Sequence, residues 1–230
     1  MMKILVLLIA SILPAFLLWL YIWRKDPQKE PMGQLMKALM YGVGAFWFAG
    51  GIELFISGSL WNATGNLTLL DTTAMAFLGA SIPEESIKLC ALWWLLRRNP
   101  YFDEHVDGIV YAVCIGLGFA AMENIGYVAM EEDWITVAIA RALLAVPGHY
   151  AFAVLMGYYY SVYHFIDRSW KTGVKILLVP ILAHGIYDML AMSGLASPAV
   201  GGVCAIALVV FCIRMHRIAY KKLEEQIGRE

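Results

Sequence analysis

The chain has 230 residues, of which 61% are hydrophobic and 15% are charged, and its mean hydropathy is +0.68. Soluble domains carry about 25% charged residues, so this composition excludes an ordinary soluble protein and indicates an integral membrane protein. The formal net charge of -1 offers no excess of basic residues, and we expect no nucleic-acid partner.

Seven apolar segments are long enough to be transmembrane helices, since a helix needs roughly 20 residues to cross the bilayer core. In chain order they are 3–23, 38–58, 73–96, 108–130, 142–165, 174–192 and 197–213. The first lacks the cleavage motif of a signal peptide, so we expect it to be retained. The sequence therefore predicts an all-α polytopic protein with a single transmembrane domain, 1–230.

The segments that connect these spans alternate between basic and non-basic. Lysine and arginine follow the first, third, fifth and seventh spans, for example as Arg24, Lys25, Arg97, Arg98, Arg168 and Lys171 and throughout the tail 214–230. The stretches 59–71, 131–134 and 193–198 contain neither residue type. The positive-inside rule then predicts an external N-terminus and a cytoplasmic C-terminus. Residues 134–140 are expected to form an interfacial helical turn, with Arg141 at the outer interface.

Several polar side chains lie inside the predicted spans. An ionised residue at a helix centre costs about 2.5 to 3.5 kcal/mol, so such residues are functional candidates. With a rise of about 1.5 Å per residue, their depths overlap in the middle-to-outer half of the bilayer. They are expected to share one water-filled cavity and are Glu84, Glu85, Lys88, Glu123, Asn124, His149, His184 and Asp188. Glu53, near the outer end of its span, is expected to be interfacial instead.

Sequence spacing predicts two pairs within this set. Glu84 and Lys88 are four residues apart, as are His184 and Asp188, so each pair shares one helix face. Asp188 is therefore expected to orient the His184 ring, and Lys88 to neutralise a carboxylate.

Proline also recurs beside these polar residues, as Pro83, Pro147 and Pro180. Each proline lacks an amide hydrogen and leaves a carbonyl of the preceding turn free, which membrane helices tolerate where protein or water satisfies it. The prolines therefore support the prediction of a hydrated pocket at this depth.

Adjacent carboxylates in a low-dielectric site repel each other, so one of them is expected to keep its proton. One ionised and one protonated carboxyl, with histidines as donors to a developing oxyanion, suffice for peptide hydrolysis. Alternatively, zinc could bind among Glu84, Glu85, Glu123, His149 and His184, since carboxylate and imidazole are suitable ligands. An ion or proton-coupled transporter could use the same residues as a relay, and a non-catalytic binding protein is a third alternative. The motifs GxSxG, HExxH and GxGD are absent from the chain.

Five segments in order, "PEESIKL", "YFDEHVDGIVY", "GLGFAAMENIGY", "RALLAVPGH" and "LAHGIYD", resemble the PrsW family of bacterial intramembrane proteases, which is related to the CAAX-processing proteases. The resemblance covers about residues 20 to 192, and the core that carries the motifs is about 73–192.

The resemblance implies a multi-pass protease of the bacterial cell membrane. Its substrate would be a single-span anti-sigma factor in the lipid bilayer, cut first on the outer side, which leads to activation of an extracytoplasmic-function sigma factor. The essential glutamate pair of the family falls on Glu84 and Glu85, and its essential histidine on His184. Further motifs place Glu123, Asn124 and His149 beside them.

Overall fold

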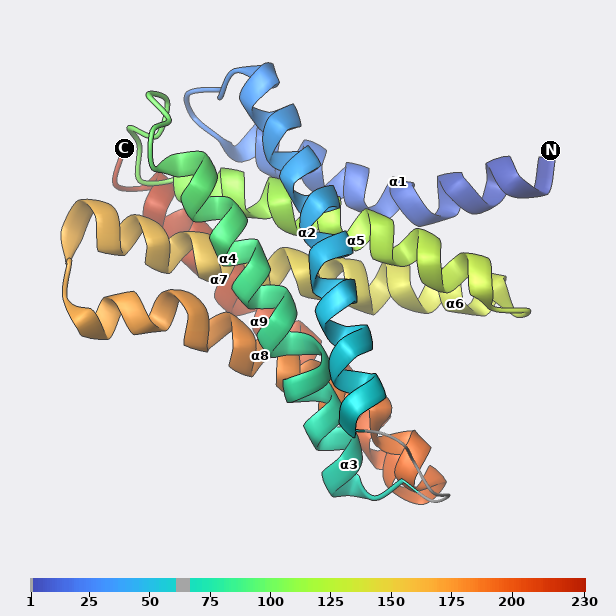
Figure 1. Cartoon of the computed structure of the whole chain (residues 1–230). Helices are drawn as coiled ribbons and strands as arrows, with labels where there is room; N and C mark the ends of the chain where they lie inside the picture. Colours follow the sequence, from blue (N-terminus) through green and yellow to red (C-terminus); the bar gives the residue numbers. More distant parts are fainter. Residues whose placement is uncertain (1, 61–66) are drawn as a thin grey trace.

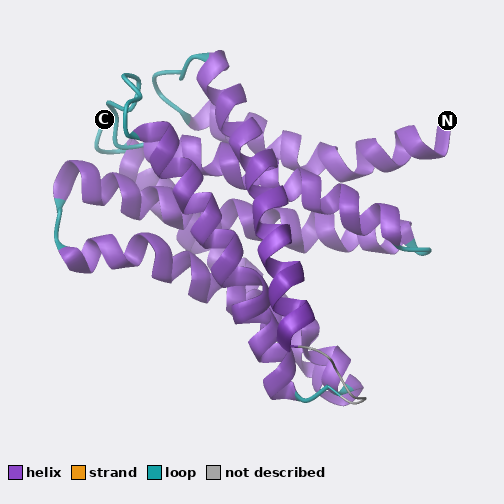
Figure 2. Cartoon of the chain, in the orientation of Figure 1, coloured by secondary structure: helices purple, strands orange, loops and turns teal. Residues whose placement is uncertain are grey.

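The computed structural model describes residues 2–60 and 67–230, and every regular element in these ranges is a helix (Figure 2). The prediction of an all-α polytopic protein is thereby confirmed. In chain order the helices are α1 (Met2–Lys25), α2 (Met32–Leu60), α3 (Leu69–Ala74), η1 (Met75–Ser81), α4 (Ile82–Leu96), α5 (Asp107–Met130), α6 (Trp134–Ala140), η2 (Arg141–Ala145), α7 (Val146–Ser161), η3 (Val162–Ile166), α8 (Trp170–Ala196) and α9 (Pro198–Ile227), where η marks a π-helical stretch.

Six helical stretches of the described chain are long and apolar enough to cross a membrane: Val6–Lys25, Met32–Ile56, Asp107–Met130, Trp134–Ile166, Trp170–Ala196 and Pro198–Ile227. They coincide with six of the seven predicted spans, and the last continues through most of the basic tail. The predicted span 73–96 is also helical, as η1 and α4, but it is not among the six. The reason is that Glu84, Glu85 and Lys88 make it less apolar.

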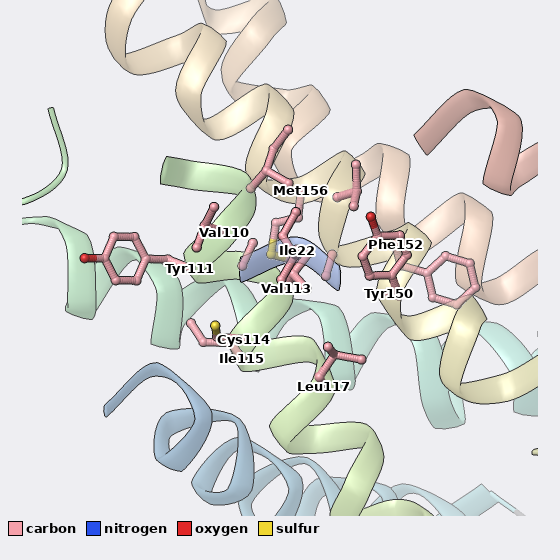
Figure 3. Close-up of a cluster of buried hydrophobic side chains, with 14 of the residues drawn as sticks. Ile22, Val110, Tyr111, Val113, Cys114, Ile115, Leu117, Tyr150, Phe152 and Met156 are labelled. Carbon is pink, nitrogen blue, oxygen red and sulfur yellow. The ribbon is translucent and has the colours of Figure 1, made fainter. Parts of the chain in front are cut away.

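Helix α5 lies at the centre of the bundle and packs against α1, α2 and α7. Side chains from α5 and α7, together with Ile22 of α1, form the cluster of buried hydrophobic residues in Figure 3. Helices α5 and α7 touch closely where two glycines meet. A Cβ atom on Gly157 would lie 2.3 Å from the carbonyl oxygen of Gly108, so only glycine permits this approach.

The loops 26–31, 97–106 and 167–169 lie at the same end of the molecule as the C-terminus (Figure 1). We call this the basic end, because the lysines and arginines that follow the odd-numbered spans gather there. The N-terminus and the α5–α6 connection lie at the opposite end, where α1 and α5 point away from α2, α3 and α8 (Figure 1). The grouping of these residues at one end matches the predicted charge alternation. That the basic end faces the cytoplasm stays a prediction.

Two of the three prolines noted in the sequence follow π-helical stretches. Pro83 comes just after η1, and Pro147 just after η2, whereas Pro180 lies inside α8. At the end of η1 the amide of Ile82 donates to the carbonyl of Phe77, five residues earlier. Such an insertion widens one turn and relieves the clash between the proline ring and the preceding carbonyl. Residues 134–140, predicted as an interfacial turn, form α6, which continues through η2 into α7.

Candidate active site

Three helices bring four side chains together in the interior of the bundle. Glu84 and Glu85 come from α4, His149 from α7 and His184 from α8. All four are buried, and one ligand atom from each lies within 4.8 Å of those of the others. We call this set the Glu–His cluster. Its residues were all predicted from the sequence as site members.

Lys88 provides the positive charge inside the cluster. Its Nζ lies 2.8 Å from Glu84 Oε2 and 2.9 Å from Glu85 Oε1, so one ammonium bridges both carboxylates. The same nitrogen lies 3.3 Å from His149 Nδ1 and 3.9 Å from the centre of the Phe119 ring. The expected pairing of Lys88 with Glu84 is therefore present, and it extends to Glu85.

His184 lies between two carboxylates. Its Nδ1 is 2.9 Å from Glu85 Oε1, and its Nε2 is 3.2 Å from Asp188 Oδ2, in the pairing that the sequence spacing predicts. The ring stacks on Phe152 at 4.9 Å between centroids, which fixes its plane. With carboxylate oxygens at both nitrogens, a ring that donates from both is the cationic imidazolium.

Glu123 and Asn124 belong to a second layer around His149. Glu123 Oε2 lies 2.7 Å from His149 Nε2 and 2.7 Å from Arg141 Nη2. Arg141 Nε donates to Asn124 Oδ1 at 2.5 Å, and the amide nitrogen of Asn124 donates to the carbonyl of Ser11 in α1 at 3.1 Å. Glu123 therefore contacts the Glu–His cluster through His149, while Asn124 holds Arg141 and ties α5 to α1.

A cavity of about 730 Å³ opens beside the cluster, between the helices that diverge away from the basic end. Glu84, His149 and His184 line it, whereas Glu85, which is 1% exposed, lies behind Glu84. The lining also includes the apolar residues Phe46, Met75, Phe119, Leu144, Phe152, Leu195 and Leu208. Glu84 is therefore the member of the carboxylate pair that a molecule in the cavity can reach.

Two further charged residues line the cavity. Arg141 pairs with Glu123, and its predicted position at the outer interface stays a prediction. Glu53 was expected to be interfacial, but it lines the cavity, and its Oε1 is buried without a hydrogen-bond partner among the described residues. The available signal for Glu53 was that it is the lone charged residue in 38–58. Arg141 lacked such a signal, because its distance to Glu123 depends on how two helices pack.

The Glu–His cluster also suits a metal ion. It offers two carboxylate oxygens and two imidazole nitrogens within 4.8 Å of one another, a donor set that zinc accepts in proteins. The Lys88 ammonium contacts three of these four side chains, so a metal ion there would compete with Lys88 for the same lone pairs.

Comparison with known proteins supplies the family. The family model described as "PrsW family intramembrane metalloprotease" matches residues 30–215. "Protease PrsW" of Clostridioides difficile is 31% identical over 228 residues, which cover 96% of this chain and 92% of that protein. No solved structure is significantly similar to the chain.

Two further relatives give the same result. "Protease PrsW" of Geobacillus kaustophilus is 32% identical and covers 81% of this chain and 80% of its own length. "Protease PrsW" of Bacillus subtilis is 33% identical and covers 79% of this chain and 80% of its own length. Six helices among the described residues can span a membrane, so the chain is a multi-pass protein of the bacterial cell membrane, and it belongs to the PrsW family of intramembrane proteases.

Proposed function

We propose that this protein hydrolyses a peptide bond in a single-span membrane protein. The substrate is an anti-sigma factor cut first on the outer side, which leads to activation of an extracytoplasmic-function sigma factor. The observation that carries the proposal is the Glu–His cluster at the wall of a cavity, with one carboxylate facing the space and one held behind it. The chain 1–230 acts as one protease domain, and its core is 73–192.

The basic end is predicted to be cytoplasmic. The residues that line the cavity lie in the other half of the bundle. A cut made there falls toward the outer side of the membrane, as the resemblance to the family implies. Apolar residues such as Leu144, Leu195 and Leu208 line the cavity and suit an apolar peptide segment. A transmembrane substrate that unwinds locally would reach Glu84 through this cavity.

In the proposed reaction, Glu84 takes a proton from water as the water oxygen attacks the substrate carbonyl carbon. The proton then passes to the departing amine as the C–N bond breaks, so Glu84 acts first as base and then as acid. His184 and His149, which also line the cavity, stabilise the negative charge of the oxyanion or shuttle protons. Glu85 and Asp188 hold His184 in the cationic form, and Glu123 with Arg141 holds His149.

The same side chains fit the metal-dependent alternative. Glu84, Glu85, His149 and His184 would hold the ion, which when bound supplies Lewis-acid polarisation of the substrate carbonyl. Glu123 contacts His149, and Asp188 contacts His184, so each histidine keeps an orienting carboxylate in either mechanism. Chelation distinguishes the two, because only the metal-dependent reaction stops when the metal is removed.

The test is co-expression of the protein with a tagged single-span anti-sigma factor, followed by detection of the truncated product and mass spectrometry of its new terminus. We expect cleavage by the wild type and none by Glu84→Gln, Glu85→Gln or His184→Ala. Purified wild-type protein is then assayed with and without a chelator. If all three variants still cut, the assignment of the site is wrong. If the wild type does not cut and instead conducts ions, the transporter alternative holds.

A further inference from the structure

A second group of buried carboxylates lies at the basic end, remote from the Glu–His cluster. Asp26 follows α1, Glu104 lies in the loop 97–106, and Asp107 begins α5. One carboxylate oxygen from each lies within 4.8 Å of those of the other two. We call these three residues the acid cluster. They come from "DPQKEP" and "YFDEHVDGIVY", two segments that the proposed hydrolysis does not use.

The acid cluster is buried and incompletely paired. Asp26 is 1% exposed, Glu104 is 7% exposed and Asp107 is fully buried. Both carboxylate oxygens of Glu104 lack a hydrogen-bond partner in the described chain, as do Asp26 Oδ1 and Asp107 Oδ1. Buried polar atoms are nearly always hydrogen-bonded, and buried charges are nearly always paired or bound to a metal. These oxygens therefore point to a ligand that supplies positive charge.

Within the described residues, the acid cluster has no ion pair with a lysine or arginine, although the Lys29 ammonium lies near Asp26. In residues 2–60 and 67–230, no lysine or arginine forms an ion pair with Asp26, Glu104 or Asp107. Lys25, next to Asp26 in the sequence, pairs with Glu224, and Lys29 donates to the backbone carbonyls of Arg24 and Asp26. In the Glu–His cluster, by contrast, Lys88 forms ion pairs with two carboxylates.

Backbone amides hold one oxygen of each aspartate and leave the other free. Asp107 Oδ2 accepts from the amides of Asp103 at 3.0 Å and Glu104 at 2.7 Å. Asp26 Oδ2 accepts from the amide of Glu30 at 3.2 Å. The Oδ1 atoms of both aspartates are the ones without partners. The two side chains are therefore fixed in place with an oxygen available to a ligand.

The acid cluster also concentrates negative charge in a buried site. Burial raises the pKa of Glu104 to about 6, with Glu230 and Asp26 as the next contributors. Burial likewise raises the pKa of Asp26. Glu30 and Asp103 add to the negative charge, since their carboxylates also lie within 4.8 Å of Asp107.

We propose that Asp26, Glu104 and Asp107 bind a hard divalent cation of the Mg²⁺ or Ca²⁺ type. Oxygen donors alone favour these ions over zinc, which prefers nitrogen and sulfur. The bound cation joins the α1–α2 loop to the start of α5 and to the loop after α4. It thereby fixes, from the opposite end, the helices that carry Glu84, Glu85 and Glu123.

The test uses the purified full-length protein in a neutral detergent, freed of divalent ions and compared at constant ionic strength. Thermal unfolding is followed during titration with Mg²⁺ or Ca²⁺. We expect a saturable rise in Tm of about 5 °C for the wild type, from mass action on the folded state. Isothermal titration calorimetry is expected to show one equivalent of Mg²⁺ or Ca²⁺ bound.

Glu104→Gln is the informative variant, because it removes a charge that has no partner and should fold. We expect it to lose the calorimetric binding and the rise in Tm. Two control variants should keep the calorimetric binding and the rise in Tm. They are Glu84→Gln, in the Glu–His cluster, and Glu224→Gln, at an exposed ion pair of the basic end. The proposal is overturned if the wild type binds neither ion, or if Glu104→Gln binds as the wild type does.

Discussion

The Glu–His cluster and the acid cluster both bury carboxylates inside the bundle, but they differ in how the negative charge is balanced. Each of the four side chains in the Glu–His cluster has a polar partner within the protein, chiefly Lys88, Glu123 and Asp188. In the acid cluster, four carboxylate oxygens have no donor in the described residues. The difference indicates that side chains of the protein balance the charge of the first site, whereas the second fits an external cation.

The strongest way to break this comparison is to remove the internal cation with Lys88→Met. Glu84 and Glu85 would then be buried side by side with only the ring of His184 near them in the described structure to balance their charge. Removing one partner of a buried ion pair costs about 3 to 5 kcal/mol, so we expect a large drop in the free energy of unfolding and no cleavage.

Chemical denaturation in detergent measures the stability of Lys88→Met, and the co-expression assay measures its cleavage. Lys88→Met combined with Glu85→Gln should recover part of the lost stability, because it removes one of the two carboxylates. Full stability in Lys88→Met alone would contradict the role assigned to the ammonium.

The second prediction concerns Arg141, which acts on the Glu–His cluster only through Glu123 and His149. We expect Arg141→Gln to reduce the cleavage rate about 10- to 100-fold, the usual range for partners that orient active-site ligands. Arg141→Lys keeps the charge and should lose less. Initial rates of product formation on purified protein measure both, with thermal unfolding as the check on folding. Equal rates for the wild type and Arg141→Gln would show that Arg141 does not contribute to the reaction.

The third prediction tests the same comparison at the acid cluster. In buffer without divalent ions, Glu104→Gln should be more stable than the wild type by about 1 kcal/mol, because it removes a buried charge without a partner. Saturating Mg²⁺ should cancel or reverse the difference, since only the wild type gains from binding. Parallel denaturation curves with and without Mg²⁺ provide the measurement. A variant less stable than the wild type in both buffers would indicate that Glu104 has a protein partner.

The smallest effect is expected at Lys25 and Glu224, a pair that lies at the basic end with side chains 35% and 39% exposed. Exposed ion pairs contribute little to stability because water and salt screen them. Glu224→Gln should leave Tm unchanged within error and should not alter the response to Mg²⁺. A clear shift in Tm would show that charge at the basic end acts over a longer range than the acid cluster alone.

Much of the site could be predicted because its signals are local. Four-residue spacing paired Lys88 with Glu84 and Asp188 with His184, since side chains at that spacing share a helix face. Seven spans were predicted from hydropathy, and six of them are long and apolar enough to cross a membrane in the described residues. The seventh, 73–96, is helical but is interrupted by Glu84, Glu85 and Lys88. Charged residues inside apolar segments were therefore both the obstacle to assigning the span and the best indication of the site.

The remaining features depend on packing between distant segments. Asp26 and Asp107 are 81 positions apart, and they meet because α1 packs along α5. Which glutamate of the pair faces the cavity depends on the rotation of α4, and η1 changes that rotation just before Pro83. Arg141, the first residue of η2, similarly reaches Glu123 of α5 across the bundle. Sequence spacing in regular α-helices does not contain this information.

The π-helical stretches η1 and η2 have a consequence for how the protein can vary. Each holds an additional residue just ahead of a helix that bears Glu84 or His149. One residue corresponds to about 100° of helical rotation, so deleting Gly79 or Leu143 would turn those side chains toward lipid or the wrong neighbour. Insertions and deletions should therefore be tolerated in the connecting loops but not in η1 or η2, although nothing in the composition of these two stretches marks them.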